Sequence, residues 1–381
     1  MNEVRALVEA FDKAVDAGDS CALATIVSVE GSSYRRPGAR MLICENGMTT
    51  GTISAGCLER DVIVHAERVI ATGETKLVEY DNASTSDEMA WGLGLGCNGI
   101  VRVLIEPVTR DSPYIQALRE SSEMRPDAPT ILAATVYQGP VAAGARLFIR
   151  QEGEIKSEDL NGAGSAITRE IQTIAESGTA FRDHTIEISG GAVKLFVEKL
   201  MPPVSLVIFG AGQDALPIVE YARGLGWQVE VVDPQAREVS RERFAMADRV
   251  TLARPEDVGS TVTITSRTLA LVMSHDYRHD LAALEFLLAS PARYIGVMGP
   301  RKRTERMLAE LGMRDETELT RLHSPVGLDI GANGPVEIAF SIIAEMRAVL
   351  EGKRGGMLRD SRGPIQSTEP SANGNAPAVH V

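Results

Sequence analysis

Cysteine is scarce in this sequence, and several familiar patterns are missing from it. The four cysteines, Cys21, Cys44, Cys57 and Cys97, form no C-x-x-C pair, which argues against a disulfide framework and against zinc or iron–sulfur binding. No apolar run reaches the length of a membrane span, and lysine and arginine form no long block. We therefore expect no metal site, no membrane insertion and no nucleic-acid surface.

The residues that are present are typical of an acidic globular protein. Apolar residues make up 44% of the 381-residue chain, and the formal net charge is −13. The first 18 residues have an amphipathic helical pattern with acidic residues instead of a signal peptide, so we expect a cytoplasmic protein. From residue 352 to 381, Gly, Pro, Ser and Asn accumulate without apolar periodicity, which predicts a disordered tail.

The stretch from Val204 to Asp233 predicts a dinucleotide-binding unit. A short apolar strand pattern is followed by Gly210, Gly212 and Ala215 in the spacing G-x-G-x-x-A, then by a helix pattern and a second strand. Without a Cβ, Gly212 would let a pyrophosphate approach the amides of the helix N-terminus. Asp233 ends the second strand, where an acid can accept hydrogen bonds from ribose hydroxyls.

Strand and helix patterns keep alternating beyond this unit, which predicts a Rossmann-like parallel sheet domain over residues 204–350. Ligands of such sheets bind beyond the carboxyl ends of the strands, where His275 and Arg301 are expected. His275 belongs to a cluster with acidic neighbours that suits acid–base chemistry and helix capping equally well. Arg301 precedes a helix, where phosphate binding and simple solvation are both open.

Residues 1–200 predict a mixed α+β domain, and a division into two lobes near residue 110 is left open. Residues 141–148 are read as one strand of this domain. Its loop arginines Arg35, Arg36 and Arg40 have the side chains that clamp phosphate, although a solvated loop explains them too. The fold class is thus α/β, with a C-terminal Rossmann-like domain after an α+β domain.

Two cysteines of this domain are candidate reactive groups, whereas Cys21 is read as a small buried apolar residue. Cys57 directly precedes an apolar helix pattern, and a helix N-terminus favours the thiolate. Cys97 lies among four glycines, a composition typical of close backbone approach. For Cys57 the alternative is a small residue packed under the turn, and for the segment of Cys97 it is close approach to another part of the chain instead of to a ligand.

Six motifs, taken together, resemble the XdhC/CoxI family over nearly all of residues 1–350. They are G-x-I-S-x-G-C-L-E, G-x-G-C-x-G, G-A-G-x-D-A-x-P, S-H-D, Y-I-G-x-x-G-x-R and H-S-P-x-G-L-D-I-G-A. The resemblance implies an accessory protein that binds molybdenum cofactor in its molybdopterin form. It further implies sulfuration of the cofactor with a cysteine desulfurase, delivery to an apo molybdenum hydroxylase of the xanthine dehydrogenase type, and a cofactor-binding role near Cys57 and Cys97.

These features are compatible with three classes of function, which differ in the cofactor that the protein binds. The preferred hypothesis is a cofactor chaperone with little turnover of its own, in which Cys57 or Cys97 contacts molybdenum or relays sulfur as a thiolate. The alternative is an NAD(P)-dependent oxidoreductase with His275 or His279 as proton donor, and the third is a scaffold without cofactor. A homodimer is left open as the oligomeric state.

Overall fold

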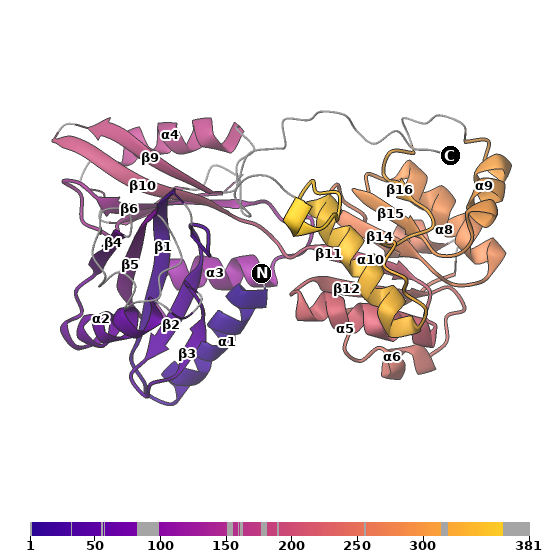
Figure 1. Ribbon diagram of the computed structural model, residues 1–381, viewed down its shortest axis with the longest axis horizontal. Coiled ribbons are helices and arrows are strands. Elements are labelled where there is room, and N and C mark those ends of the chain that lie inside the picture. The colour runs from indigo at the N-terminus through magenta and orange to yellow at the C-terminus, as the bar shows by residue number, and fades with distance from the viewer. Residues whose placement is uncertain are drawn as a thin grey trace. The chain divides into compact units, whose positions relative to one another are not determined.

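A computed structural model of the chain describes residues 2–31, 33–54, 56, 58–81, 99–150, 155–158, 160, 163–176, 181–188, 190–254, 257–313 and 319–360 (Figure 1). The chain forms two compact units. The N-terminal unit contains residues 3–124 and 128–202, and the C-terminal unit consists chiefly of residues from Pro203 onward. None of the described helices is both long and apolar enough to cross a membrane.

The first sheet of the N-terminal unit is antiparallel, with the strand order β3-β2-β1-β5-β4. Helix α2 packs its apolar side against one face of this sheet, while α1 and α3 cover the other face. The elements are α1 (Asn2–Asp16), β1 (Cys21–Gly31), β2 (Arg40–Cys44), β3 (Thr49–Gly51), α2 (Glu59–Thr72), β4 (Lys76–Asp81), β5 (Gly99–Val108) and α3 (Pro113–Glu123).

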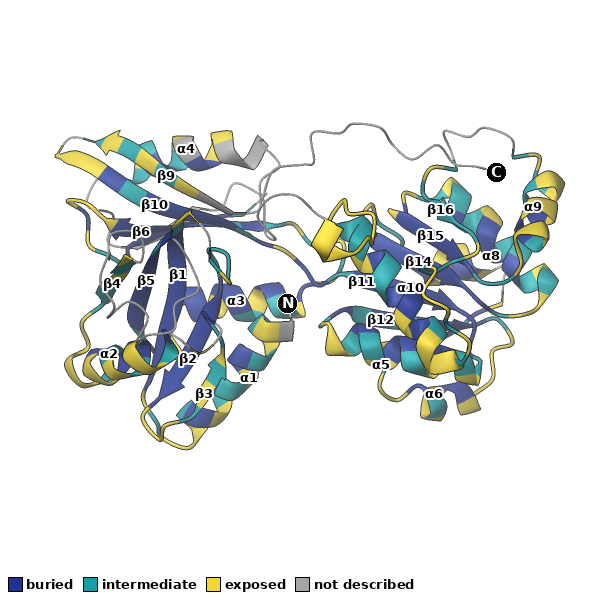
Figure 2. Cartoon of the chain, viewed as in Figure 1, coloured by how far each residue is buried: buried dark blue, intermediate teal, exposed yellow. Residues whose placement is uncertain are grey.

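The second sheet of this unit is also antiparallel, with the order β8-β7-β6-β10-β9, and α4 covers one of its faces. Val27 and Leu104 of the first sheet pack with Tyr137 and Phe196 of the second in one buried cluster. Figure 2 shows the central strands of both sheets largely buried. The elements are β6 (Ile131–Gln138), β7 (Arg146–Ile149), β8 (Ile155–Glu158), α4 (Gly164–Glu176), β9 (Phe181–Ile188) and β10 (Gly191–Leu200).

The predicted strand over residues 141–148 is wrong in its first half. Gly144 has a φ of 94°, and the amide of Ala145 bonds back to the carbonyl of Ala142 at 3.1 Å. The chain therefore turns before β7 begins at Arg146. A turn of this kind has little apolar signature, because Ala and Gly suit strands and turns alike.

The C-terminal unit has a six-stranded parallel sheet in the order β13-β12-β11-β14-β15-β16, which confirms the predicted Rossmann-like fold. Helices α5 and α10 cover one face and α7, α8 and α9 the other (Figure 1). The elements are β11 (Ser205–Phe209), α5 (Leu216–Gly224), β12 (Gln228–Asp233), α6 (Val239–Arg243), β13 (Arg249–Leu252), α7 (Val258–Thr261), β14 (Thr268–Val272), α8 (Tyr277–Ala289), β15 (Tyr294–Val297), α9 (Arg301–Glu310), β16 (Leu322–His323) and α10 (Pro335–Leu350).

Candidate functional site

The glycine turn after β11 lies at the centre of the parallel sheet. Gly210 has a φ of 141°, and a Cβ added there would lie 2.5 Å from the carbonyl oxygen of Met273. Only glycine fits this position, because the turn passes directly against the chain that leaves β14. The predicted turn residue Gly210 therefore lies directly against the chain at the end of β14.

The residues after the turn offer hydrogen-bond donors. Residues 213–215 form a short 3₁₀ helix that runs into α5, and the side chain of Ala215 is fully buried beneath it. Within the described part of the chain, no protein acceptor takes the backbone N–H of Gly212, Gln213 or Asp214. Free amides at the start of a helix are suited to an anion such as a phosphate.

A carboxylate of the chain itself lies over this turn. A Cβ added at Gly212 would be 2.3 Å from Oδ1 of Asp214, so the space that the glycine leaves open is already taken. The other oxygen, Oδ2, lies 2.6 Å from Nε2 of His275. Asp214 was not singled out from the sequence, because its partner is 61 residues away in the chain. The motif G-A-G-x-D was the only available signal.

His275 is the member of the predicted acid–base cluster that faces the turn. Its φ of 63° is unusual for a residue with a Cβ, and its side chain is 58% exposed. The neighbouring residue Ser274 donates from its amide and its hydroxyl to Oδ1 of Asp280, at 2.9 and 2.6 Å. These bonds hold the residue that precedes His275, and the imidazole of His275 is presented to solvent beside Asp214.

The acidic neighbours of His275 have structural roles. Asp276 caps α8 by accepting hydrogen bonds from the amides of Arg278 and His279, and the bond from His279 is the main reason that its pKa is lowered. Asp280 is buried and lies 2.7 Å from the guanidinium of Arg303 in α9. The capping interpretation therefore holds for Asp276, whereas Asp280 anchors both Ser274 and Arg303.

Asp233 ends β12 as predicted, but its carboxylate is fully buried. Oδ2 accepts hydrogen bonds from the hydroxyl of Ser240 at 2.6 Å and from Nε of Arg237 at 3.0 Å, and Oδ1 accepts one from the amide of Gln235 at 3.0 Å. Burial raises the pKa of Asp233, whereas the hydrogen bonds from Ser240, Arg237 and Gln235 lower it. Together these bonds outweigh burial, so the net shift of the pKa is downward. Its predicted ribose contact stays a prediction and requires these bonds to be shared or exchanged.

The predicted arginines differ in their burial and in their partners. In the N-terminal unit, Arg35 pairs with Glu3 near the surface and Arg36 is half-buried in the loop before β2. Arg40 is buried instead of lying in an exposed loop. In the C-terminal unit, Arg301 is exposed at the first residue of α9. The predicted phosphate contacts of these arginines stay predictions.

Arg40 belongs to a buried ionic network that sequence reasoning missed. Its guanidinium pairs with Glu198 of β10 and donates to the hydroxyl of Tyr114 at 2.6 and 3.0 Å. Arg146 pairs with Glu106, and its guanidinium carbon lies 3.9 Å from the ring centre of Tyr114. Burial lowers the pKa of Arg40, but the attraction of Glu198 and the hydrogen bonds to Glu198 and Tyr114 together raise it by more, so the guanidinium stays charged. This network joins β2, α3, β5, β7 and β10.

Cys57 and Cys97 lie outside the described residues, so their predicted roles stay predictions. The helix expected after Cys57 is present as α2. The carboxylate of Glu59 accepts hydrogen bonds from the amides of Ser54 and Gly56, at 2.8 and 3.1 Å, and from the hydroxyl of Thr52 at 2.8 Å. The chain that precedes Cys57 is therefore tied to the first residue of that helix.

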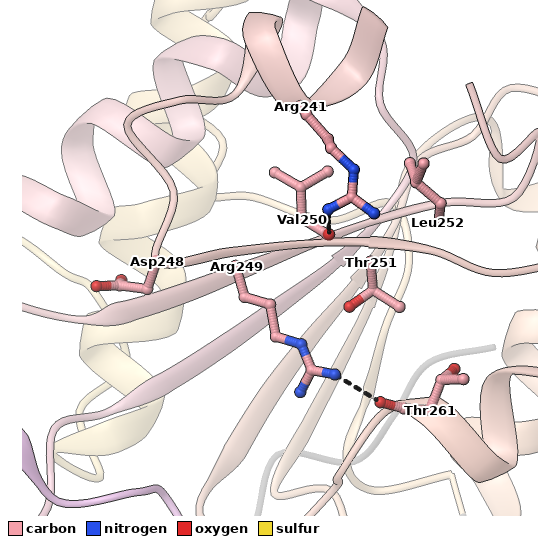
Figure 3. Close-up of a pocket in the computed structure, with 7 residues that line it drawn as sticks. All are labelled: Arg241, Asp248, Arg249, Val250, Thr251, Leu252 and Thr261. Carbon is pink, nitrogen blue, oxygen red and sulfur yellow. Dashed lines mark hydrogen bonds between the residues drawn. The ribbon is translucent and has the colours of Figure 1, made fainter. Parts of the chain in front are cut away.

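A surface hollow of about 480 Å³ lies away from the glycine turn, at the outer strand β13 (Figure 3). Arg241 donates to the carbonyl of Val250, and Arg249 donates to the carbonyl of Thr261, both at 3.4 Å. Figure 3 shows Arg241 reaching from its helix to the strand and Arg249 reaching from the strand toward Thr261. None of the predicted site residues that the structure describes lines this hollow.

The chain is similar to proteins whose names connect them with molybdenum enzymes. Residues 206–346 match the model described as the XdhC Rossmann domain, and residues 14–81 match the model of the XdhC and CoxI family. A protein of Bacillus subtilis (strain 168), named as a probable subunit of xanthine dehydrogenase, is 31% identical over 341 residues, which cover 88% of this chain and 95% of the relative. The molybdenum cofactor insertion chaperone PaoD of Escherichia coli (strain K12) is 21% identical over 88% of this chain and 86% of its own length.

A solved structure agrees with these matches over both units. The crystal structure of a protein described as a xanthine dehydrogenase, from Bacillus halodurans, has 31% sequence identity and a TM-score of 0.74, and the match covers 93% of this chain and 98% of that one. These comparisons confirm the predicted resemblance for the N-terminal unit and for the C-terminal Rossmann domain. This chain belongs to the XdhC and CoxI family.

Proposed function

We propose that the protein is an accessory protein that binds molybdenum cofactor, supports its sulfuration and delivers it to xanthine dehydrogenase or a related molybdenum hydroxylase. The observation that carries the proposal is the match over 88% of the chain to a relative named a molybdenum cofactor insertion chaperone, within a shared family. The expected partners are the apo-hydroxylase and a cysteine desulfurase.

The described residues fit the phosphate end of such a cofactor. The amides of Gly212, Gln213 and Asp214 have no protein acceptor in the described structure, and donors of this kind bind phosphate oxygens. The carboxylate of Asp214 must move before an anion reaches them, and His275 is the group that holds it. Asp214 and His275 thus control access to the turn.

The cysteines would act at the metal end. Bound cofactor supplies a molybdenum centre carried on a pterin, and soft thiolates are suitable ligands for such a metal. Cys57 and Cys97 are the two thiols in glycine-rich segments, and the hydrogen bonds of Glu59 fix the chain beside Cys57. Binding, orientation and sulfur relay are the roles that we assign to this chain, with chemistry on the substrate left to the hydroxylase.

The direct test is to purify the protein from molybdenum-replete cells, denature it, oxidise the supernatant and measure the fluorescent pterin. Gly212→Ala should lose most of the bound pterin, because its Cβ meets Asp214 and narrows the approach to the amides. Gly224→Ala is the matched control, since a Cβ there meets nothing within 4 Å. Cys57→Ala and Cys97→Ala should lower hydroxylase activity in cells.

Retention of pterin and of hydroxylase activity by all three site variants would refute the proposal. Absence of any pterin in the wild-type protein would favour the scaffold. The same supernatant tests the oxidoreductase alternative, which the strand order and the free amides of the turn support. Stoichiometric NAD(P) together with hydride transfer that His275→Ala abolishes would establish that alternative instead.

A further inference from the structure

Two cysteines outside the proposed cofactor site lie directly opposite each other on neighbouring strands. Cys21 is the first residue of β1 and Cys44 is the last residue of β2, and the antiparallel register pairs them. Both are free thiols with 2% of their surface exposed. Both side chains belong to the same buried cluster, beneath α1 and α3, so they point to the same face of the sheet.

The ladder geometry places these two thiols unusually close. The amide of Glu45 bonds to the carbonyl of Ser20 at 2.9 Å, whereas the amide of Cys44 bonds away from β1, to Met48 at 3.0 Å. Because pair types alternate along an antiparallel ladder, Cys21 and Cys44 form a pair without mutual backbone hydrogen bonds. Such pairs have Cα atoms about 4.5 Å apart, at the short end of the range that a disulfide spans.

The turns that flank the pair hold the register. Nδ2 of Asn46, in the turn after β2, donates to Asp19 in the turn before β1 at 2.6 Å. The side chain of Asn46 also accepts a hydrogen bond from the amide of Met48 at 2.8 Å. The two strand ends therefore cannot slide past each other without breaking these bonds, and the sulfur atoms stay opposite.

Burial controls how fast the pair can react. It raises the pKa of both thiols, and the nearby charge of Asp19 adds to the effect for each of them. Thiolate is the reactive form, so oxidation of the closed structure is slow at neutral pH. The pair lies at the ends of its strands, where local opening is easiest, and this opening gives a small oxidant access.

We propose that Cys21 and Cys44 are a reversible redox site, which a peroxide converts into a cross-strand disulfide. One thiolate attacks the peroxide oxygen to give a sulfenic acid and hydroxide, and the second thiol displaces that oxygen as water. Two thiols and one hydrogen peroxide thus give one disulfide and two waters. The bond ties β1 to β2 and stabilises the N-terminal unit, while the short span keeps it reducible by small thiols.

The test uses the full chain with Cys57→Ser and Cys97→Ser, so that only the two paired thiols remain. The folded protein is treated with hydrogen peroxide, denatured and alkylated with N-ethylmaleimide. The expected product is monomeric, has lost two hydrogens, carries no adduct and yields a peptide that joins Cys21 to Cys44. Dithiothreitol should restore two adducts, and the oxidised form should have the higher Tm.

Cys21→Ala in the same background is the control, and it should carry one adduct before oxidation and form no internal link. Two free thiols after a treatment that fully oxidises the denatured protein would overturn the proposal, as would disulfide-linked dimers. If the background variant fails to fold, peptide mapping of the oxidised wild-type protein decides, since only a Cys21–Cys44 peptide supports the site. These readouts are independent of cofactor retention.

Discussion

Neutralising Glu198 should destabilise the N-terminal unit more than almost any other single polar substitution. Its carboxylate is 1% exposed, pairs with Arg40 and accepts a hydrogen bond from Tyr114. Glu198→Gln keeps the size of the side chain but leaves the guanidinium of Arg40 as an uncompensated buried charge. Breaking one partner of a buried pair costs about 3–5 kcal/mol, and we expect the lower end because glutamine still reaches Tyr114.

The measurement is urea unfolding followed by far-ultraviolet circular dichroism, together with hydrogen exchange at β6 and β10. Glu9→Gln is the matched control, because Glu9 pairs with Arg5 at the surface and its loss should change stability very little. The double variant Arg40→Met/Glu198→Gln should lose less stability than the two single changes added together.

A loss below about 1 kcal/mol for Glu198→Gln, or strict additivity with Arg40→Met, would refute this reasoning, because it would show that the pair is solvated. The two units can unfold separately, so the exchange data are needed to assign the loss. Protection should fall in β6 and β10 and stay unchanged in the parallel sheet.

Three further predictions concern the C-terminal unit. Gly210→Ala should destabilise it by about 3 kcal/mol or more, because the Cβ meets backbone atoms at 2.5 Å, whereas Gly224→Ala should be neutral or stabilising by thermal unfolding. Asp214→Asn should tighten binding of pyrophosphate in calorimetric titration, because the carboxylate no longer opposes an anion, and Asp276→Asn should not. Glu345 of α10 contacts the imidazole of His323, the phenol of Tyr294 and the amide of Gly327, at 2.9, 2.7 and 2.7 Å. Burial raises the pKa of Glu345, but these hydrogen bonds together lower it by more, so its stabilisation is present above the unfolded pKa and is lost as pH falls through the folded one. Glu345→Gln should therefore flatten the loss of stability measured below about pH 4.5.

The parallel sheet could be predicted from the sequence because its signals are local. Five buried residues in β11 precede a glycine turn, and the apolar run of β12 ends at the expected acid. The cap of α8 was one of the two interpretations that the sequence left open, because Asp276 immediately precedes the helix that it caps. Each of these features depends on neighbours within a few residues, which is the range over which propensity and capping act.

The buried network could not be predicted in the same way. Arg40 stands in a segment rich in Gly, Pro and Arg, and such segments are usually exposed. Its partner Glu198 lies 158 residues further along the chain. Only the packing of the two antiparallel sheets brings these residues together, and a single sequence contains no local sign of that pairing. Charged residues inside otherwise apolar strands, as at Glu198 and Glu106, were the one available hint that charges are buried there.

The carboxylates of Asp214 and Asp233 together affect which ligand the glycine turn can bind. The sequence predicts a bare turn that receives pyrophosphate and an Asp233 that receives a ribose. In the structure Asp214 lies over Gly212, and the oxygens of Asp233 are engaged by Arg237 and Ser240. A dinucleotide would therefore have to displace two internal contacts, whereas a ligand with one phosphate needs only Asp214 to turn away. The geometry of the turn itself thus favours the smaller ligand.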